Sequence, residues 1–190
     1  MDVKTGVSVE EYFEQLATSE VKLEYRDGEI VAMSGAQPAH NLVAMNLVMS
    51  FAACLKEQGC LLYSSDQLIR VEACDRYTFP DLVIVCQTPR YEKSKRGLDA
   101  LLNPTIVVEV LSDSTEAYDR GDKYECYQTL ESLEEYVLVS SRKKKVEVFS
   151  RNTPFEWILR IYNEENSKIR IGACEIDLAE VYRKVTFEAS

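Results

Sequence analysis

Two carboxylates interrupt apolar runs of the sequence. Residues 79–85 read FPDLVIV and place Asp81 just before four apolar residues, and residues 105–111 read TIVVEVL and place Glu109 inside a second run. A buried carboxylate costs free energy unless it is paired, protonated or bound to a cation. Since proline lacks an N–H and suits the first position of a strand, Pro80 predicts that Asp81 lies where its strand begins.

If the two strands are neighbours, Asp81 and Glu109 can hold one hard cation between them. Mg²⁺ and Mn²⁺ prefer oxygen ligands and keep several waters. Such a metal activates a water and neutralises charge that builds up on a phosphate. The alternative is that each acid pairs with a buried arginine or caps a turn. For one acid alone the two interpretations are balanced, and the presence of both acids favours a site.

A lysine follows the Glu109 strand at a helical position. In STEAYDRGDKYECYQ (residues 114–128), Lys123 lies one turn into a predicted helix and could reach back over the end of the strand. A lysine beside a metal-bound phosphate can position the attacking water or stabilise the transition state. The alternative is an exposed lysine that pairs with Asp119 or Glu125.

Three further polar residues are weaker candidates. Glu24, in KLEYRDGEI, precedes a predicted hairpin turn and could equally be part of a strand surface. His40 is the single histidine and lies at a helix start, where a structural role is more common than a catalytic one. Asp66 is a candidate acid on a neighbouring strand.

The elements that must position these residues predict a mixed α+β fold around one sheet, with strands in the majority. A capping box at Ser8 and Glu11 starts the first helix. The polar segment 88–103 is interpreted as a loop. The other expected elements are a hairpin around RDG at 26–28, a helix at 39–59 that ends at Gly59, strands at 60–72, 76–87 and 104–112, a helix at 119–133, a hairpin at 134–151, strands at 155–163 and 167–178, and a last helix at 178–185.

Length and charge limit the possible functions. The 190 residues, 46% hydrophobic and 28% charged, fit one globular domain spanning 1–190. A formal charge of −10 is unfavourable for nucleic-acid binding unless a local basic patch or a bound metal compensates. Basic residues cluster at 90–97 and 141–151. The first cluster lies between the two acid-bearing strands and is the better candidate for phosphate contacts, whereas the second resembles a solvated hairpin turn.

The six cysteines contain no CxxC pair, which argues against a structural zinc site. Cys54 and Cys86 lie in apolar runs and are interpreted as buried thiols of a reducing compartment. The acidic N-terminal sequence does not resemble a signal peptide, and no apolar stretch approaches the roughly 20 residues of a membrane span. We therefore expect a cytoplasmic location and no membrane partner.

The ordered set of motifs resembles the PD-(D/E)xK nuclease superfamily. More closely, it is similar to the putative restriction endonuclease family of prokaryotic proteins. The resemblance runs through LEYRDGEIVAMSGA, HN, FPDLVIV, IVVEVLSDST, DRGDKYECYQ and LEEYVLV, and covers roughly residues 8–182. It implies a restriction-endonuclease-like core, in which a mixed β-sheet is flanked by helices and extended by β-hairpins.

The resemblance also implies roles for individual residues. Asp81 and Glu109 would be the two superfamily acids, and Glu24 would be a further ligand of one or two Mg²⁺ or Mn²⁺ ions. The superfamily lysine normally follows the second acid by two positions. That position is Leu111 here, so the lysine's role would move to Lys123. The implied activity is metal-dependent endonuclease cleavage of nucleic acid, with DNA the expected substrate.

Two other functions stay open on the sequence. Leu111 at the usual lysine position favours a catalytically inactive interaction module that kept the fold. The acidic composition is better tolerated by a metal-dependent hydrolase of a smaller phosphorylated substrate. The superfamily resemblance further implies a homodimer, for which FEWILRIYN, with Trp157, is a candidate edge strand. An ordinary half-buried strand is the alternative there.

Overall fold

The computed structural model describes residues 6–56, 58–94, 98–164 and 167–187. Its strands form two six-stranded sheets and one two-stranded sheet, where the sequence predicted a single sheet. The six-stranded sheet that contains Glu109 is called the central sheet, and the other the outer sheet. Five α-helices and one 3-10 turn, η1 (Glu72–Cys74), complete the described elements. The mixed α+β fold predicted from the sequence is confirmed.

The central sheet carries β9 (Ile106–Leu111) in its interior, where both faces are covered. Its strand order is β12 (Glu156–Tyr162), β11 (Val146–Thr153), β10 (Glu135–Ser140), β9, β6 (Leu82–Val85) and β3 (Leu61–Ser64). β9 runs parallel to β10 and antiparallel to β6. All six residues of β9 are buried, including Glu109. This explains the nearly continuous apolar run in the sequence, since a strand buried on both faces does not alternate.

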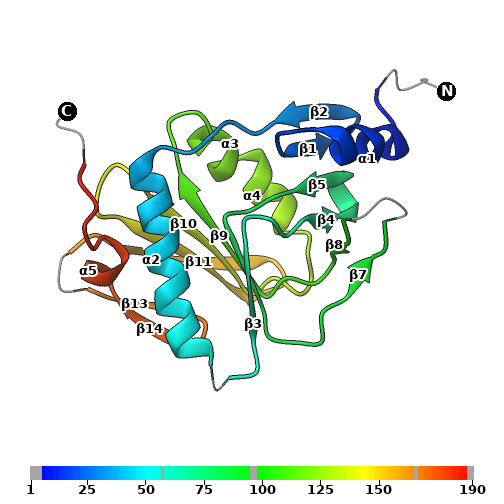
Figure 1. The fold of residues 1–190 in the computed structure, drawn as a ribbon. Coiled ribbons are helices and arrows are strands. Elements are labelled where there is room, and N and C mark those ends of the chain that lie inside the picture. The colour runs from blue at the N-terminus through cyan, green and yellow to red at the C-terminus, as the bar shows by residue number, and fades with distance from the viewer. Residues whose placement is uncertain (1–5, 57, 95–97, 165–166, 188–190) are drawn as a thin grey trace.

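Different layers cover the two faces of the central sheet (Figure 1). One face packs against α2 (Pro38–Leu55), α5 (Leu178–Val181) and the hairpin of β13 (Lys168–Ile171) and β14 (Cys174–Asp177). The other face packs against α4 (Asp122–Tyr127) and against residues of the outer sheet. α3 (Glu116–Arg120) lies directly before α4 in the chain.

Helix α2 is long and apolar enough, by length and composition alone, to cross a membrane. In the structure its inner face instead belongs to the protein core. Val43, Leu47 and Phe51 are fully buried, and the helix contacts β3, β9 and β14. These contacts account for the apolar residues on the inner side of the helix, whereas its outer side stays exposed.

The outer sheet and α1 (Val9–Thr18) hold the strand that carries Glu24. The strand order is β2 (Glu29–Ala32), β1 (Leu23–Arg26), β5 (Arg76–Thr78), β4 (Ile69–Val71), β8 (Ala100–Leu101) and β7 (Tyr91–Glu92). The predicted capping box is present at the start of α1. Tyr12 of this helix donates a hydrogen bond of 2.8 Å to the carbonyl of Leu23. This bond fixes the helix against β1, one residue before Glu24.

Two predicted elements differ from the observed ones. The segment 88–103 is not wholly a loop, because β7 and β8 form an antiparallel pair within it. Each of these strands is only two residues long, which is too short to show the alternation of apolar and polar residues that marks a strand in a sequence. The helix predicted at 119–133 is two short helices, since the backbone leaves the helical region at Gly121 (φ −108°, ψ −109°). This break turns α4 so that Lys123 is buried.

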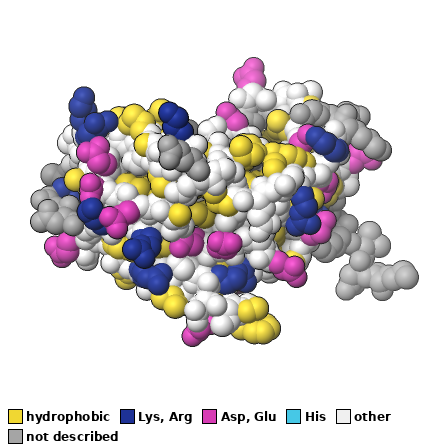
Figure 2. Space-filling model, turned by 90° about the horizontal axis from the view of Figure 1, so that it is seen from below, with side chains coloured by type: hydrophobic (Ala, Val, Ile, Leu, Met, Phe, Trp, Pro, Cys, Tyr) yellow, Lys and Arg dark blue, Asp and Glu magenta, His cyan; other side chains and the backbone are white. Residues whose placement is uncertain are grey.

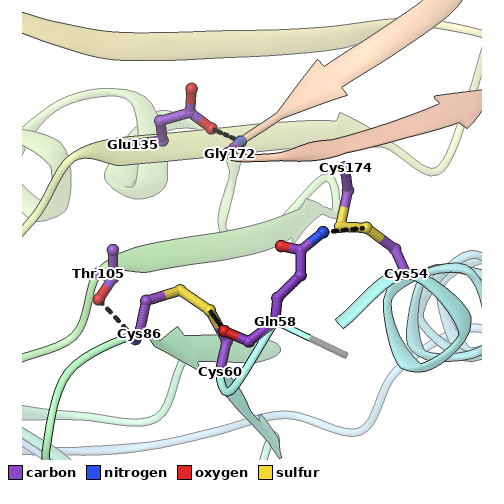
Figure 3. The surroundings of a disulfide bond; sticks show 8 residues. All are labelled: Cys54, Gln58, Cys60, Cys86, Thr105, Glu135, Gly172 and Cys174. Carbon is purple, nitrogen blue, oxygen red and sulfur yellow. Dashed lines mark hydrogen bonds between the residues drawn. A yellow bond between two sulfur atoms is a disulfide. The ribbon is translucent and has the colours of Figure 1, made fainter. Parts of the chain in front are cut away.

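The cysteines form three disulfides, so the interpretation of Cys54 and Cys86 as buried thiols is wrong. The pairs are Cys54–Cys174, Cys60–Cys86 and Cys74–Cys126. Figure 3 shows the first two pairs, with the backbone N–H of Cys86 donating to Thr105. Cys60 and Cys86 lie at the ends of the neighbouring strands β3 and β6. Sequence spacing does not reveal such proximity, and the predicted cytoplasmic location stays a prediction.

A buried acid on β11 gives the fold a pH dependence. Burial would raise the pKa of Glu147, but hydrogen bonds from Arg120 and Lys145 lower it below its usual value. A lowered pKa contributes stability above the unfolded value near 4.5 and loses it as the pH falls through the folded value. We therefore expect Glu147→Gln to lose about 1–2 kcal/mol at neutral pH and to lose less further stability than wild type on acidification. Urea unfolding of wild type and Glu147→Gln between neutral and acidic pH measures both losses of stability. If the unfolding free energies of the two proteins fell equally with pH, Glu147 would not be the source of this pH dependence.

Candidate functional site

Asp81 and Glu109 lie side by side at the junction of β6 and β9. Leu82 pairs with Val108 in the antiparallel ladder, and one step further along places Asp81 beside Glu109. Asp81 Oδ2 accepts a hydrogen bond of 2.7 Å from the backbone N–H of Val110. The carboxylate is thus anchored to the strand that carries the second acid. The apolar runs place both acids where two buried strands meet.

His40, at the start of α2, contacts the same carboxylate. Its Nε2 lies 3.3 Å from Asp81 Oδ2. Burial lowers the pKa of His40, but the hydrogen bond and the charge of Asp81 outweigh it and leave the pKa above its ordinary value. His40 therefore orients Asp81, a contact that the sequence could not reveal because the two residues lie on separate elements.

Lys123 is the centre of the cluster. Its Nζ lies 2.8 Å from Glu109, 3.5 Å from Asp119 and 3.6 Å from Glu24. No member of this group of four is more than 4% exposed. The lysine comes from α4, the two glutamates from the central and outer sheets, and Asp119 from the helix turn before Lys123. We call these four residues, with Asp81, the acidic cluster.

Glu24 reaches the cluster from β1. Its Oε1 accepts a hydrogen bond of 3.0 Å from the N–H of Phe79, and its Oε2 lies 2.8 Å from Arg26. Burial raises the pKa of Glu24, but Lys123 and the two hydrogen bonds outweigh it and hold the pKa below its usual value. Glu24 is therefore ionised, and the strand-surface interpretation of this residue does not describe its buried position.

The carboxyl groups outnumber the cations in the cluster, and the pKa values reflect this. Burial raises the pKa of Glu109 well above its usual range, and the charges of Asp119 and Asp81 add to that effect against Lys123. Burial also raises the pKa of Asp119. Burial alone would lower the pKa of Lys123, but Glu109 and Glu24 raise it well above its ordinary value. The neighbouring carboxylates therefore favour the charged form of Lys123, whereas burial favours the neutral forms of Glu109 and Asp119.

The cluster suits a hard divalent cation by its donor chemistry. Four carboxyl groups supply oxygen ligands of the kind that Mg²⁺ and Mn²⁺ prefer, and their excess charge is what such an ion would neutralise. Among the described residues, no three acidic, histidine or cysteine side chains are already spaced around an ion position. Lys123 lies among the carboxylates instead. By their donor chemistry, Asp81, Glu109 and Glu24 are the residues that could hold such an ion.

Basic and aromatic side chains lie beside the cluster on the Glu24 side. The guanidinium of Arg26 stacks 3.5 Å from the ring centre of Tyr118, and that of Arg76 lies 5.7 Å from the same ring. Arg76 also donates to the carbonyl of Asp122, directly before Lys123. Both arginines are partly exposed. Arg26 also pairs with Glu24, so it is in direct contact with the cluster.

The remaining sequence candidates lie elsewhere or are already paired. Asp66 is exposed and pairs with Lys22, so the structure does not bring it to the cluster. In the basic segment 90–97, Lys93 pairs with Asp99, and residues 95–97 lie outside the described part of the chain. In the segment 141–151, Arg142 pairs with acids of the α3 region and Lys145 with Glu147.

Sequence reasoning missed the places of two residues. Asp119 is a buried member of the cluster, and its spacing of four positions from Lys123 signalled the contact, although the sequence suggested an exposed pair. His40 was assigned a structural role. A histidine on an apolar helix carries no sequence signal for a partner 41 positions away, and only the fold reveals Asp81 beside it.

Comparisons with known proteins agree with this architecture. Two curated proteins of Synechocystis sp. (strain ATCC 27184 / PCC 6803 / Kazusa), named Uncharacterized protein slr1290 and Uncharacterized protein sll1609, are similar to the chain. The first is 33% identical over 95% of this chain and 94% of its own, and the second is 26% identical over 87% and 93%.

A solved structure and a family model extend the comparison. The crystal structure of a "putative nuclease" from Anabaena variabilis ATCC 29413 superposes with a TM-score of 0.73, covering 93% of this chain and 97% of that one at 14% identity. That likeness establishes the fold alone. A model of the family described as "Putative restriction endonuclease" matches residues 9–177. The chain, which carries the expected motifs on the expected fold, therefore belongs to the Putative restriction endonuclease family.

Proposed function

We propose that the protein is a metal-dependent endonuclease that hydrolyses phosphodiester bonds, with DNA as the expected substrate. One observation carries the proposal: Glu24, Glu109 and Asp119 converge within 4 Å of the buried ammonium of Lys123, with Asp81 beside Glu109. A protein core has no structural need for three carboxyl groups around one lysine with a fourth beside them, since burying unpaired charge costs several kcal/mol per group. Membership of the nuclease-like family supports the same activity.

The proposed site divides its work between the acids and the lysine. A divalent cation bound by Asp81, Glu109 and Glu24 would supply an activated water and charge neutralisation at the phosphate. His40 orients Asp81 through the 3.3 Å contact. Lys123 is kept protonated by its acidic neighbours, so it donates hydrogen bonds and stabilises negative charge that develops on the phosphate. Because its pKa is raised, Lys123 is assigned this stabilising role and not that of a general base.

Substrate contact is proposed to come from Arg26 and Arg76 rather than from a broad basic surface. Figure 2 shows lysine and arginine side chains mixed with acidic ones on the face that it displays, without a single-sign patch. A net charge of −10 therefore has to be offset locally. Two arginines beside the cluster can bind phosphate bidentately. Arginine–phosphate contacts release counterions from the nucleic acid, which predicts cleavage that weakens as the salt concentration rises.

Cleavage assays with purified protein test the proposal. We expect Mg²⁺ or Mn²⁺ to support cleavage of DNA, and EDTA to abolish it. Cleavage of RNA alone would change the substrate and keep the chemistry. Hydrolysis of nucleotides without cleavage of polynucleotides would favour the smaller phosphorylated substrate, which the acidic surface tolerates better. Absence of metal-dependent hydrolysis on all of these would favour the inactive interaction module, consistent with Leu111 in place of the usual lysine.

A further inference from the structure

Two arginines lie directly opposite each other in the outer sheet, next to the acidic cluster. Arg26 of β1 and Arg76 of β5 are partners in the antiparallel ladder. Like charges placed opposite each other in this way destabilise a sheet. Glu24 compensates one of the two charges through its 2.8 Å ion pair with Arg26. Among the described residues Arg76 has only uncharged acceptors, which are the hydroxyl of Tyr118 and the carbonyl of Asp122.

Both guanidinium groups keep a hydrogen-bond donor that the protein does not use. The Nε atoms of Arg26 and Arg76 are buried, and neither has an acceptor among the described residues. Leaving a buried donor unpaired is costly, and most buried polar groups of folded proteins are paired. The side chain of Arg26 is 26% exposed, so this guanidinium can be reached from solvent. Two cations with unused donors are suited to the oxygen atoms of one anion.

The ring of Tyr118 keeps the two guanidinium groups together. Tyr118 lies on α3, and the guanidinium of Arg26 stacks 3.5 Å from its ring centre. The guanidinium of Arg76 lies 5.7 Å from the same ring centre, and the ammonium of Lys123 lies 5.8 Å from it. The face of an aromatic ring attracts cations. One side chain therefore offsets the mutual repulsion of three neighbouring positive charges.

The backbone of α3 fixes the place of this ring. The carbonyl of Tyr118 accepts a hydrogen bond from the N–H of Gly121, where the helix breaks. The carbonyl of Asp119 accepts one of 2.8 Å from the hydroxyl of Tyr136. The carboxyl group of Asp119 lies 3.5 Å from Lys123. Two consecutive residues thus serve different groups, because Asp119 belongs to the acidic cluster and Tyr118 contacts the arginines.

The hydroxyl of Tyr118 takes no part in the chemistry that is proposed for the cluster. Burial and the charge of Glu24 raise the pKa of Tyr118 above its ordinary value, so the hydroxyl stays protonated near neutral pH. It accepts a hydrogen bond of 3.4 Å from Nη1 of Arg76. The contacts of Tyr118 are therefore those of a residue that acts through the arginines.

We propose that Tyr118 is a positioning residue that holds Arg26 and Arg76 as one clamp for a single phosphate of nucleic acid. The clamp rests on the proposed function, which supplies nucleic acid as the ligand and the two arginines as its contacts. The new elements are that both arginines act on the same phosphate, that the ring of Tyr118 sets their spacing, and that the clamp binds without a metal ion.

Fluorescence anisotropy of a fluorescein-labelled DNA duplex, with the full chain in EDTA, tests the clamp. We expect Tyr118→Leu to bind about tenfold more weakly than wild type, which is the effect of losing a partly desolvated cation–π contact. Tyr118→Phe keeps the ring and is expected to retain most of the affinity. The slope of log affinity against log salt concentration is expected to be shallower for Tyr118→Leu by about 0.9, the value for one phosphate contact.

Tyr91→Leu is the matched control, because the ammonium of Lys93 lies 5.5 Å from the ring centre of Tyr91 in the same outer sheet. β7, which carries Tyr91, is the edge strand away from β1 and β5. We expect this variant to bind DNA like wild type. In an Arg76→Gln background, Tyr118→Leu is expected to have a smaller effect than in wild type, because Tyr118 acts through that arginine. Circular dichroism checks that the variants fold.

Four results would overturn the proposal. They are undiminished DNA binding by Tyr118→Leu, equal losses for Tyr118→Leu and Tyr118→Phe, an undiminished effect of Tyr118→Leu in the Arg76→Gln background, and a wild type that binds inorganic phosphate but no DNA in EDTA. Failure of the proposed function gives a different result. A protein without metal-dependent hydrolysis whose DNA binding still needs the ring of Tyr118 would refute the nuclease and keep the clamp. If both hold, Tyr118→Leu is expected to raise KM more than it lowers kcat.

Discussion

Replacing Asp81 by Asn, or Glu109 by Gln, is expected to lower metal-dependent cleavage by at least about 100-fold. Mutating a residue that only hydrogen-bonds to a metal ligand typically lowers metal affinity or activity by about 10–100-fold. Asp81 and Glu109 are proposed as ligands themselves, so their loss is expected to have at least the larger of these effects. Each amide keeps the shape of its acid but removes the charge that holds a divalent cation. The measurement is the initial rate of DNA cleavage at saturating Mg²⁺.

The matched control for these variants is Asp66→Asn, which changes an exposed acid outside the cluster. Asn at position 81 can still accept the hydrogen bond from the Val110 N–H, so the fold is expected to persist. Full cleavage by both cluster variants, with a circular dichroism spectrum like that of wild type, would contradict the assignment of Asp81 and Glu109.

Replacing Lys123 by Met is expected to destabilise the fold by about 3–5 kcal/mol in the presence of EDTA. Removing one partner of a buried ion pair leaves an uncompensated charge, which costs about this much. Glu24 and Glu109 would both lose the ammonium that lies within 4 Å of them. Urea unfolding at neutral pH measures the loss. The same change is expected to raise the pKa of the remaining carboxyl groups.

Lys143→Met provides the control, because Lys143 is exposed in the hairpin turn between β10 and β11. We expect it to change the unfolding free energy by less than about 0.5 kcal/mol. Equal midpoints for Lys123→Met and wild type would mean that the ammonium does not stabilise the acidic cluster. The buried position of Lys123 would then need a different explanation.

The strands that carry the acids could be predicted because their signal is local. The apolar runs around Asp81 and Glu109 gave the strand positions, and Pro80 gave the start of one of them. The capping box at Ser8 likewise fixed the start of α1. Each of these features depends on neighbours within a few residues. The convergence of Lys123 with the acids followed from the short connection between β9 and α4.

The features that could not be predicted depend on contacts between distant segments. His40 meets Asp81 only because α2 packs against β9, the neighbour of β6 in the sheet. The separate outer sheet arises because β1 pairs with β5 and β4 with β8, pairings that no periodicity encodes. The disulfides have the same origin. The whole fold determines which distant segments come into contact, whereas hydrophobic periodicity indicates only which face of one helix or strand is buried.

Calorimetric titration of Mn²⁺ into wild type and Asp81→Asn tests the central claim most directly. We expect saturable binding to wild type that is lost in the variant, because the charge of Asp81 is needed to hold the cation beside Glu109. Binding that is equal in the two proteins, or absent from wild type, would contradict it. In that case Asp81 and Glu109 would be satisfied by His40, the backbone and Lys123 alone.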